Sequence, residues 1–347
     1  MNRKDEHVSL ARAFHQKPKE NDFDAVRLVH SSLVRTRPEE IDLRTEILGL
    51  PLNVPFYINA MTGGSEKTKK INHDLAIIAR ETDLMMATGS VSAALKDPNV
   101  ADSYRIVREV NPDGLILGNM GAGRTSEDAK KIVDLLQADG MQIHLNVPQE
   151  LVMPEGDRDF HEWPQNIQQT IQQLDVPVIV KEVGFGMNKE TIQQLKGLGV
   201  KAVDVSGRGG TSFSQIENAR RKKREFTYLD DWGQSTVISL LEAQAITDLT
   251  LLASGGIRDA YDIFKALCLG ATAVGVSATI LDYLMSNGID ATIELIEDWK
   301  IQLRRLYLMT DKPTTADLVH NSIILSDAPK EWCQARGIDY RKLAVRS

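Results

Sequence analysis

The stretch LTLLASGGIRDAYDIFKALCLGATAVGVSAT, residues 249–279, decides the fold. Leu249–Ala253 and Ala271–Val276 are short apolar runs rich in β-forming residues, and Asp259–Leu269 between them carries apolar residues at helical spacing. The two runs are continuous rather than alternating, which is typical of parallel strands buried on both faces. The stretch therefore predicts a strand–helix–strand unit.

Similar runs recur along the chain, each followed by a turn and a helical pattern. The other runs are Phe56–Ala60, Leu84–Thr88, Gly114–Gly118, Met141–Asn146, Pro177–Val183 and Val200–Val205. Helical patterns between them include Lys67–Arg80, Ser126–Gln137 and Lys189–Leu198. Eight such runs with intervening helices predict the α/β class and a closed (β/α)8 TIM barrel.

An open doubly wound sheet also alternates strands and helices, but its phosphate-binding loop follows the first strand. Here the glycine-rich segment Gly118-Asn-Met-Gly-Ala-Gly123 follows the third run. Its spacing does not match the dinucleotide-binding fingerprint. The sequence therefore favours the barrel.

Two regions depart from the plain repeat within what we expect to be one domain over residues 1–347. Residues 1–50 form a polar extension before the first run, and we expect them to wrap the barrel. Residues 208–235 form a long insertion after the sixth run, and loops of this length often cover functional sites. The insertion contains the basic run Arg220-Arg-Lys-Lys-Arg224, which we expect to be a solvated helix face.

Composition excludes several classes of protein. The 347 residues include 41 Lys and Arg against 48 Asp and Glu, a formal charge of −7, which argues against nucleic acid as a partner. The 2 cysteines, Cys268 and Cys333, exclude a disulfide framework and a thiolate metal site. The N-terminus lacks an apolar signal region, and no apolar window reaches the roughly 18 residues of a membrane span. We expect a cytoplasmic protein without a membrane partner.

In barrels of this kind, the active site lies at the carboxyl ends of the strands. The seventh run continues into Ala253-Ser-Gly-Gly-Ile-Arg258 and the eighth into Gly275-Val-Ser-Ala-Thr279. Glycines let backbone N–H groups approach an anion, a helix N-terminus adds its dipole, and Arg258 adds charge. The two segments predict a phosphate site, whereas two tight turns without a ligand are the alternative.

The other strand ends carry small polar groups that suit a planar heterocycle. Thr62, Ser90 and Asn119 supply short donors and acceptors, and Lys181 supplies a cation. This combination favours a flavin, because a lysine at the pyrimidine edge stabilises the negative charge of the reduced ring. Lys181 alone is also compatible with a Schiff-base lysine or with an ion pair to Glu182.

The fourth run ends in His144-Leu-Asn-Val-Pro-Gln-Glu150, the densest polar cluster at any strand end. His144 and Asn146 alternate with apolar residues and so face one side. The lone carboxylate of Glu150 suits Mg²⁺, which keeps several waters and uses substrate phosphate oxygens as ligands. The alternatives are a satisfied interior histidine at 144 and an acid placed at a helix start at 150.

Together these motifs resemble type II isopentenyl-diphosphate isomerase, an FMN-dependent family. The resemblance rests on motifs that span nearly the whole chain: Arg3-Lys-Asp-Glu-His7, Ala60-Met-Thr-Gly-Gly64, His144-x-Asn-x-x-Gln-Glu150, Lys181-Glu-Val-Gly184, Ser206-Gly-Arg-Gly-Gly-Thr211 and Ala253-Ser-Gly-Gly-Ile-Arg258. It implies isomerisation of isopentenyl and dimethylallyl diphosphate by an allylic proton shift. It also implies reduced FMN, NADPH as the reductant, Mg²⁺ and a homo-oligomer, a tetramer or an octamer.

The resemblance also implies residue roles. The diphosphate substrate would be bound by Arg3, Lys4, His7, His144, Asn146 and Gln149. FMN would be bound by Ala60, Met61, Thr62, Ser90, Asn119, Lys181, Ser206, Thr211, Gly255, Gly256, Arg258, Ser277 and Ala278. Glu150 would hold Mg²⁺, and Gln149 would act beside the flavin N5, with the proton donor left open between them.

Three points stay open at this stage. An FMN-dependent TIM-barrel oxidoreductase of the 2-hydroxy-acid or dihydroorotate type would use the same phosphate loops and Lys181, but would leave Gln149 and Glu150 without a purpose. A non-enzymatic scaffold would be colourless. The segment Gln234-Ser235-Thr236 lacks a proline-bearing turn that the family usually has, so the course of the insertion there is not predicted.

Overall fold

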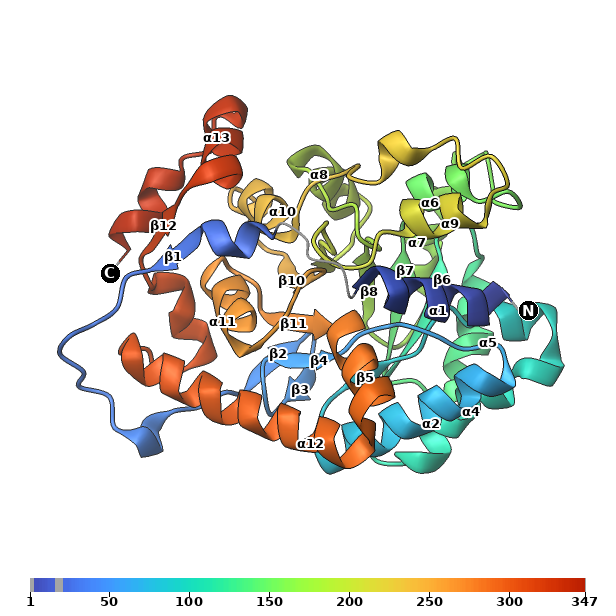
Figure 1. Cartoon of the computed structure of the whole chain (residues 1–347), viewed down its shortest axis with the longest axis horizontal. Coiled ribbons are helices and arrows are strands. Elements are labelled where there is room, and N and C mark those ends of the chain that lie inside the picture. Colours follow the sequence, from blue (N-terminus) through green and yellow to red (C-terminus); the bar gives the residue numbers. More distant parts are fainter. Residues whose placement is uncertain (1–2, 16–20, 347) are drawn as a thin grey trace.

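Eight parallel strands close into a barrel in the computed structural model (Figure 1), which describes residues 3–15 and 21–346 without the side chains of Arg3 and His15. The strands are β4 (Phe56–Ile58), β5 (Met86–Ala87), β6 (Ile116–Gly121), β7 (Gly140–His144), β8 (Val178–Lys181), β9 (Ala202–Asp204), β10 (Thr250–Ser254) and β11 (Ala273–Val276). They follow one another around the barrel in chain order, and β11 pairs with β4 to close it. Each strand overlaps one predicted run, so the predicted barrel is confirmed.

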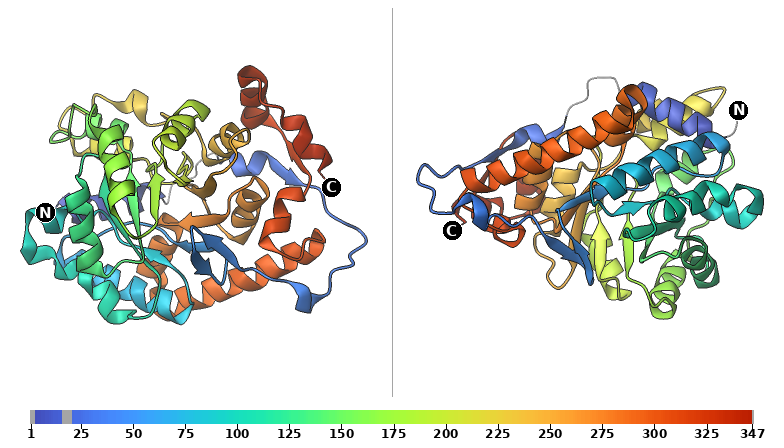
Figure 2. Two further views of the ribbon diagram at one scale, coloured as in Figure 1. Left: turned by 180° about the vertical axis from the view of Figure 1, so that it is seen from behind. Right: turned by 90° about the horizontal axis from the view of Figure 1, so that it is seen from below.

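Helices connect the strands and cover the outside of the barrel (Figures 1 and 2). They are α2 (Glu66–Glu81), α3 (Ser92–Lys96), α4 (Asp102–Val110), α5 (Ser126–Leu136), α6 (Val147–Val152), α7 (Trp163–Gln173), α8 (Lys189–Gly197), α9 (Phe213–Arg220), α10 (Thr236–Ala243) and α11 (Ala260–Cys268). Several begin directly after a capping residue, as Ser65, Thr125 and Ser235 each accept a backbone N–H from the first turn. These N-caps fix where the three helices begin.

The remaining elements come from the two ends of the chain. They are α1 (Arg3–His15), β1 (Val26–Leu28), β2 (Thr45–Ile47), β3 (Leu50–Leu52), α12 (Ala278–Met309), β12 (Ile323–Leu325), α13 (Asp327–Arg336) and the short 3-10 helices Asp22–Ala25, Pro38–Glu40, Pro98–Val100, Thr227–Leu229, Thr315–His320 and Tyr340–Val345. Strand β1 pairs antiparallel with β12 beside α13 (Figure 1). The backbone of Gly288 is non-helical, with φ 84°, and breaks α12.

The amino-terminal end of the barrel is closed by the β2–β3 hairpin. Its turn, Leu48-Gly49, has φ of 50° and 89°, the left-handed pair that a tight two-residue hairpin requires. The buried side chains of Ile47, Leu50 and Leu52 pack against residues inside the barrel, including Tyr57. Part of the predicted 1–50 extension is therefore a plug that excludes water from the floor.

Helix α1 lies on the opposite side, over the carboxyl ends of the strands. It contacts α2, α9 and α12, which come from three distant parts of the chain (Figure 2, right). Arg12 Nε donates to Asp282 of α12 at 3.0 Å, and Ser65 Oγ donates to Asp5 at 2.6 Å. These contacts hold the amino-terminal motif at the mouth of the barrel.

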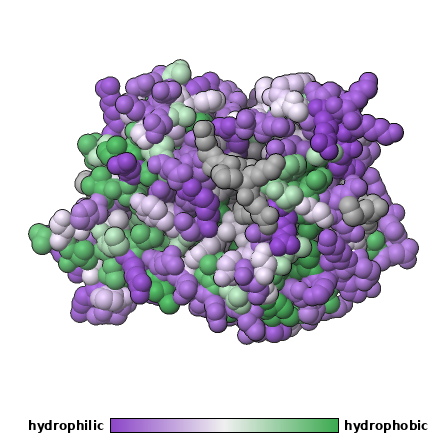
Figure 3. Space-filling model, viewed as in Figure 1, coloured by the Kyte–Doolittle hydropathy of each residue, from purple (hydrophilic) through white to green (hydrophobic). Residues whose placement is uncertain are grey.

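The surface agrees with the composition. The face drawn in Figure 3 is mostly hydrophilic, with apolar residues gathered toward one end. Leu33, in the loop after β1, is 84% exposed. In the described part of the chain, no helix combines the length and apolar character that a membrane span needs.

Candidate active site

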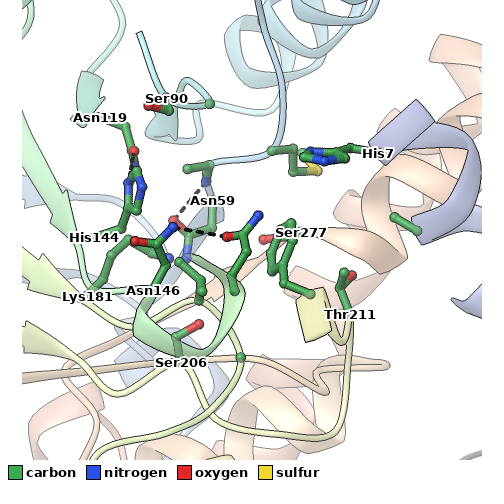
Figure 4. A pocket seen from close by; sticks show the side chains of 18 of the residues that line it. His7, Asn59, Ser90, Asn119, His144, Asn146, Lys181, Ser206, Thr211 and Ser277 are labelled. Atoms are coloured by element: carbon green, nitrogen blue, oxygen red, sulfur yellow. Dashed lines mark hydrogen bonds between the residues drawn. The ribbon is translucent and has the colours of Figure 1, made fainter. Parts of the chain in front are cut away.

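One pocket of about 620 Å³ opens at the carboxyl ends of the barrel strands (Figure 4). Its walls include every predicted site residue whose side chain the structure describes. These residues are Lys4, His7, Ala60, Met61, Thr62, Ser90, Asn119, His144, Asn146, Gln149, Glu150, Lys181, Ser206, Thr211, Gly255, Gly256, Arg258, Ser277 and Ala278. The side chain of Arg3 lies outside the described residues. The structure therefore places these residues around one pocket. Which ligand each of them binds stays a prediction.

At the β10–β11 end, the turn after β10 presents backbone N–H groups. The Gly255 carbonyl accepts from Thr236 Oγ1 at 2.7 Å, and the Gly256 carbonyl accepts from Asn21 Nδ2 at 2.6 Å. Because C=O and N–H point in opposite directions in a trans peptide, the N–H groups of Gly256 and Ile257 point away from these contacts. Neither N–H has an acceptor among the described residues.

This turn fits the phosphate of FMN. Gly255 and Gly256 have φ of 93° and 75°, and a Cβ on Gly255 would lie 2.1 Å from the Gly207 carbonyl oxygen. Only glycine fits there, and consecutive free N–H groups form an anion-binding nest. Helix α12 begins nearby at Ala278, so its positive N-terminal dipole faces the same pocket.

Arg258 differs from its expected arrangement. Its guanidinium lies 2.6 Å from Asp24 Oδ1 and 2.7 Å from Asp262 Oδ2, and these carboxylates raise the pKa of Arg258. Its charge is therefore already matched by protein groups. In this conformation the anion site relies on backbone N–H groups, and direct contact of Arg258 with a phosphate stays a prediction.

Lys181 lies deep in the pocket at the end of β8 and is 5% exposed. Its Nζ donates to the backbone carbonyl of Glu182 at 2.6 Å. The Glu182 carboxylate instead accepts the N–H groups of Val183 and Phe185, each at 2.7 Å, so it is not the ion-pair partner considered from the sequence. Burial lowers the pKa of Lys181, and the charges of Asp204 and Glu182 oppose that shift. A buried cation in this place suits the reduced flavin.

His144 lies beside Asn119, across the pocket from His7 (Figure 4). The distance from His144 Nδ1 to Asn119 Oδ1 is 2.7 Å. Burial and the positive charges of Lys181 and Lys4 lower the pKa of His144 to about 3. The imidazole is therefore neutral at neutral pH.

The mouth of the pocket is organised by Glu217 of α9, which the sequence reasoning missed. Its side chain is 0% exposed, and Oε1 accepts from Gln149 Nε2 at 3.0 Å. Oε2 accepts from Arg220 at 2.5 Å. His7 Nε2 lies 3.0 Å from Oε1, at ion-pair distance but without hydrogen-bond alignment. Burial by itself raises the pKa of Glu217, but these three contacts lower it to about 2.

Arg220 also departs from the expected solvated face. In addition to Glu217, its guanidinium contacts Glu6 Oε2 of α1 at 3.3 Å and Glu155 Oε1 at 2.7 Å. Lys222 and Lys223 are exposed, as expected. Arg220 therefore joins α1 to the insertion, and the insertion covers the mouth.

Glu150 offers a limited metal site. Its Oε1 accepts from Asn146 at 2.9 Å, and its Oε2 accepts from the Asp157 N–H at 2.9 Å. In residues 3–15 and 21–346, no group of three or more His, Cys, Asp or Glu side chains is placed to hold a metal. A single carboxylate fits Mg²⁺ that takes its other ligands from water and phosphate oxygens, but not a metal enclosed by protein.

The end of the insertion is anchored without a proline. Gln234 N–H donates to the Phe185 carbonyl at 2.8 Å, and the Gln234 carbonyl accepts from Arg208 N–H at 2.8 Å. Ser235 then caps α10. Backbone contacts thus fix the segment whose course the sequence left open.

Comparisons with known proteins identify the family of this chain. Residues 125–322 match the model of the family described as FMN-dependent dehydrogenase. The isopentenyl-diphosphate delta-isomerase of Latilactobacillus sakei is 49% identical over 96% of both chains. That of Listeria welshimeri is 47% identical over 99% of this chain and 97% of its own length.

Solved structures share the fold at low identity. A mutant flavocytochrome b2 with pyruvate bound superposes with a TM-score of 0.67 at 18% identity, covering 90% of this chain and 80% of that one. A mandelate oxidase mutant with an FMN adduct gives a TM-score of 0.63 at 15% identity, covering 92% of both chains. Near-full-length relatives at 47–49% identity are decisive, and the chain belongs to the isopentenyl-diphosphate delta-isomerase family within the FMN-dependent dehydrogenases.

Proposed function

We propose that this chain interconverts isopentenyl and dimethylallyl diphosphate by an allylic proton shift, with reduced FMN, Mg²⁺ and NADPH as the reductant. The observation that carries the proposal is one continuous pocket with two different ends. One end has free backbone N–H groups that suit the FMN phosphate, and the buried Lys181, deeper in the pocket next to His144, suits the flavin ring. The other has Lys4 and His7 on α1, facing His144 and Asn146, which suit a diphosphate.

At the diphosphate end, the charge of Lys4 and the imidazole of His7 support binding. Lys4 supplies a cation to the pocket wall. His7 Nε2 is buried 3.0 Å from Glu217 Oε1 without hydrogen-bond alignment, and a phosphate oxygen would offer an aligned acceptor. Glu150, 2.9 Å from Asn146, would hold Mg²⁺ beside the same phosphate oxygens.

Hydrogen bonds at both the nitrogen and the oxygen of its side-chain amide fix the position of Gln149. Its Nε2 donates to Glu217 at 3.0 Å, and its Oε1 accepts from Asn146 at 3.2 Å. The amide cannot serve as an acid, and Glu217 is ionised because its pKa is about 2. In this proposal, Gln149 orients the five-carbon unit and is not the acid. Reduced FMN, when bound, would supply the acid–base chemistry and an electron-rich face.

The experiment is a direct isomerisation assay. The purified protein is loaded with FMN, reduced anaerobically with dithionite, given Mg²⁺ and isopentenyl diphosphate, and followed by NMR. We expect dimethylallyl diphosphate in many turnovers per flavin, with little product when the flavin is oxidised. NADPH in place of dithionite is expected to support the same reaction. A reaction that consumes one substrate per reduced flavin would instead identify an oxidoreductase.

A further inference from the structure

The carboxylate of Asp204, at the end of β9, lies on the inner side of the barrel and is 0% exposed. It accepts from Ser254 Oγ at 2.8 Å, from Asn59 Nδ2 at 3.0 Å and from the Ser206 N–H at 3.1 Å. The Tyr57 hydroxyl lies 3.5 Å away, and burial together with Asp204 raises the pKa of Tyr57, so this hydroxyl keeps its proton. Every one of these neighbours is a donor toward Asp204.

From Asp204 a chain of three side-chain amides runs to the active site. Asn59 donates to Asp204, so its Oδ1 faces the other way and accepts from Gln142 Nε2 at 3.0 Å. Gln142 Oε1 in turn accepts from Asn119 Nδ2 at 3.0 Å. Each amide has one donor end and one acceptor end, so the direction set by the carboxylate is passed along the chain.

The chain ends on His144 and determines which ring nitrogen carries hydrogen. Asn119 presents Oδ1, an acceptor, to His144 Nδ1 at 2.7 Å, so Nδ1 must be the donor. A neutral imidazole has one ring hydrogen, which leaves a lone pair on Nε2. Nε2 has no hydrogen-bond partner among the described residues, and His144 lines the pocket.

We propose that Asp204 is a positioning residue for His144. Acting through the three amides between them, it holds His144 as the Nδ1–H tautomer with the Nε2 lone pair open to the ligand. His144 would then accept a hydrogen bond, from a protonated phosphate oxygen or a phosphate-bound water, rather than donate one. This last step rests on the proposed function, whereas the tautomer does not.

Asn119 alone is insufficient to fix the tautomer. An isolated asparagine amide can rotate and present either its oxygen or its nitrogen to a neighbour. Here the Asn119 nitrogen donates to Gln142, the Gln142 nitrogen donates to Asn59, and the Asn59 nitrogen donates to Asp204. Asn59 Oδ1 also accepts from the Ala60 N–H at 2.8 Å, so the Asp204 carboxylate and this N–H together give the chain its direction.

The test is ¹⁵N NMR of histidine-labelled holoenzyme at neutral pH without substrate. The protein has 7 histidines, and the His144→Gln variant identifies the signals of His144 by their loss. In the unsubstituted protein, we expect a protonated Nδ1 and an unprotonated Nε2. Gln142→Met interrupts the chain and is expected to lose the single Nδ1–H form. Asp204→Asn removes one of the two groups that orient Asn59 and leaves the Ala60 N–H in place, so it is expected to show a mixture of the Nδ1–H and Nε2–H forms.

Tyr57→Phe is the matched control, because it removes a hydroxyl near Asp204 but leaves the amide chain intact. It is expected to keep the Nδ1–H form. A protonated Nε2 in the unsubstituted protein would overturn the proposal, as would an unchanged tautomer in Gln142→Met or a lost one in Tyr57→Phe. If Asp204→Asn fails to fold, Gln142→Met decides, since it retains Asp204. No substrate is present, so failure here leaves the isomerisation assay untouched.

Discussion

At the β10–β11 end of the pocket, the backbone N–H groups without an acceptor come from one short turn, whereas the mouth is lined by side chains from distant segments. The N–H groups at the first end all belong to Gly255–Ile257, although Thr236 and Asn21 hold the carbonyls of this turn. The mouth joins α1, α6 and α9 through Glu217. A contiguous turn can therefore be read from a motif, while an assembled mouth depends on tertiary structure.

The largest expected effect is on kcat/KM, from a double substitution that should impair substrate binding and leave FMN binding unchanged. Replacing both Arg3 and Lys4 with alanine removes Lys4 from the pocket wall together with the second charge that the family resemblance assigns to the diphosphate. At about 1.5–3 kcal/mol for each charged contact, kcat/KM is expected to fall by about two to four powers of ten. FMN content is expected to stay normal. Steady-state kinetics on protein of measured flavin content checks this, with Lys70→Ala, an exposed lysine on α2 paired with Asp74, as the control.

Full activity in the double variant, or in a chain lacking residues 1–4, would remove the amino-terminal motif from substrate binding. Loss of FMN in either protein would show that the two ends are not separable in the way the geometry indicates.

Glu217→Gln tests the centre of the mouth. Losing one charged hydrogen bond that positions Gln149 is worth about 1.5–3 kcal/mol, so we expect kcat/KM to fall by about one to two powers of ten with FMN affinity unchanged. Glu225→Gln is the matched control, because Glu225 pairs with Arg221 in the same insertion but lies away from Gln149. Equal activity of the two variants would contradict the organising role of Glu217.

Glu150→Gln tests whether Glu150, at the mouth of the pocket, is a ligand of Mg²⁺. The amide binds Mg²⁺ more weakly than the carboxylate, so the Mg²⁺ concentration for half-maximal turnover is expected to rise by about tenfold or more. FMN binding is expected to remain the same. Turnover measured across a Mg²⁺ titration decides the point, and an unchanged curve would rule out Glu150 as a ligand.

The smallest expected effect lies at the other end. Asn21→Ala frees the Gly256 carbonyl and loosens the peptide that directs the Ile257 N–H toward the phosphate. One lost hydrogen bond is worth about 0.5–1.5 kcal/mol, so FMN affinity is expected to fall by about two- to tenfold. Riboflavin, which lacks the phosphate, is expected to bind as before.

Flavin fluorescence titration of the apoprotein measures both affinities. Asn287→Ala is the control, since Asn287 also donates to a backbone carbonyl, that of Tyr283, but on an exposed helix. A parallel loss of riboflavin affinity in Asn21→Ala would contradict a phosphate-specific role.

The fold was predictable because its signal is local and repeated. Each barrel strand is a continuous apolar run, and each connecting turn carries glycine or a capping residue. The β2–β3 plug was not predicted, because its short strands look like part of a polar extension. The elements after β11, including α13 and β12, were not predicted either, because they lie beyond the last strand–helix repeat.

In the site, the residues in strand-end motifs were found and those acting across elements were missed. Glu217 lies beside Ile216 on α9, and helical spacing alone does not show that its carboxylate is buried against α1 and α6. Asn59, Gln142 and Asp204 did leave a signal, since each is a polar residue within a predicted strand. A buried polar side chain needs a hydrogen-bond partner. The sequence therefore shows that such a residue has a partner, but it does not show which residue the partner is.

A crystal structure of the protein with FMN and inorganic pyrophosphate tests the two-ended pocket most directly. The account predicts the FMN phosphate on the N–H groups of Gly256 and Ile257, and pyrophosphate at the opposite end between Lys4, His7 and Asn146. Pyrophosphate bound on the β10–β11 turn with FMN present elsewhere, or pyrophosphate with no contact to α1, would contradict it.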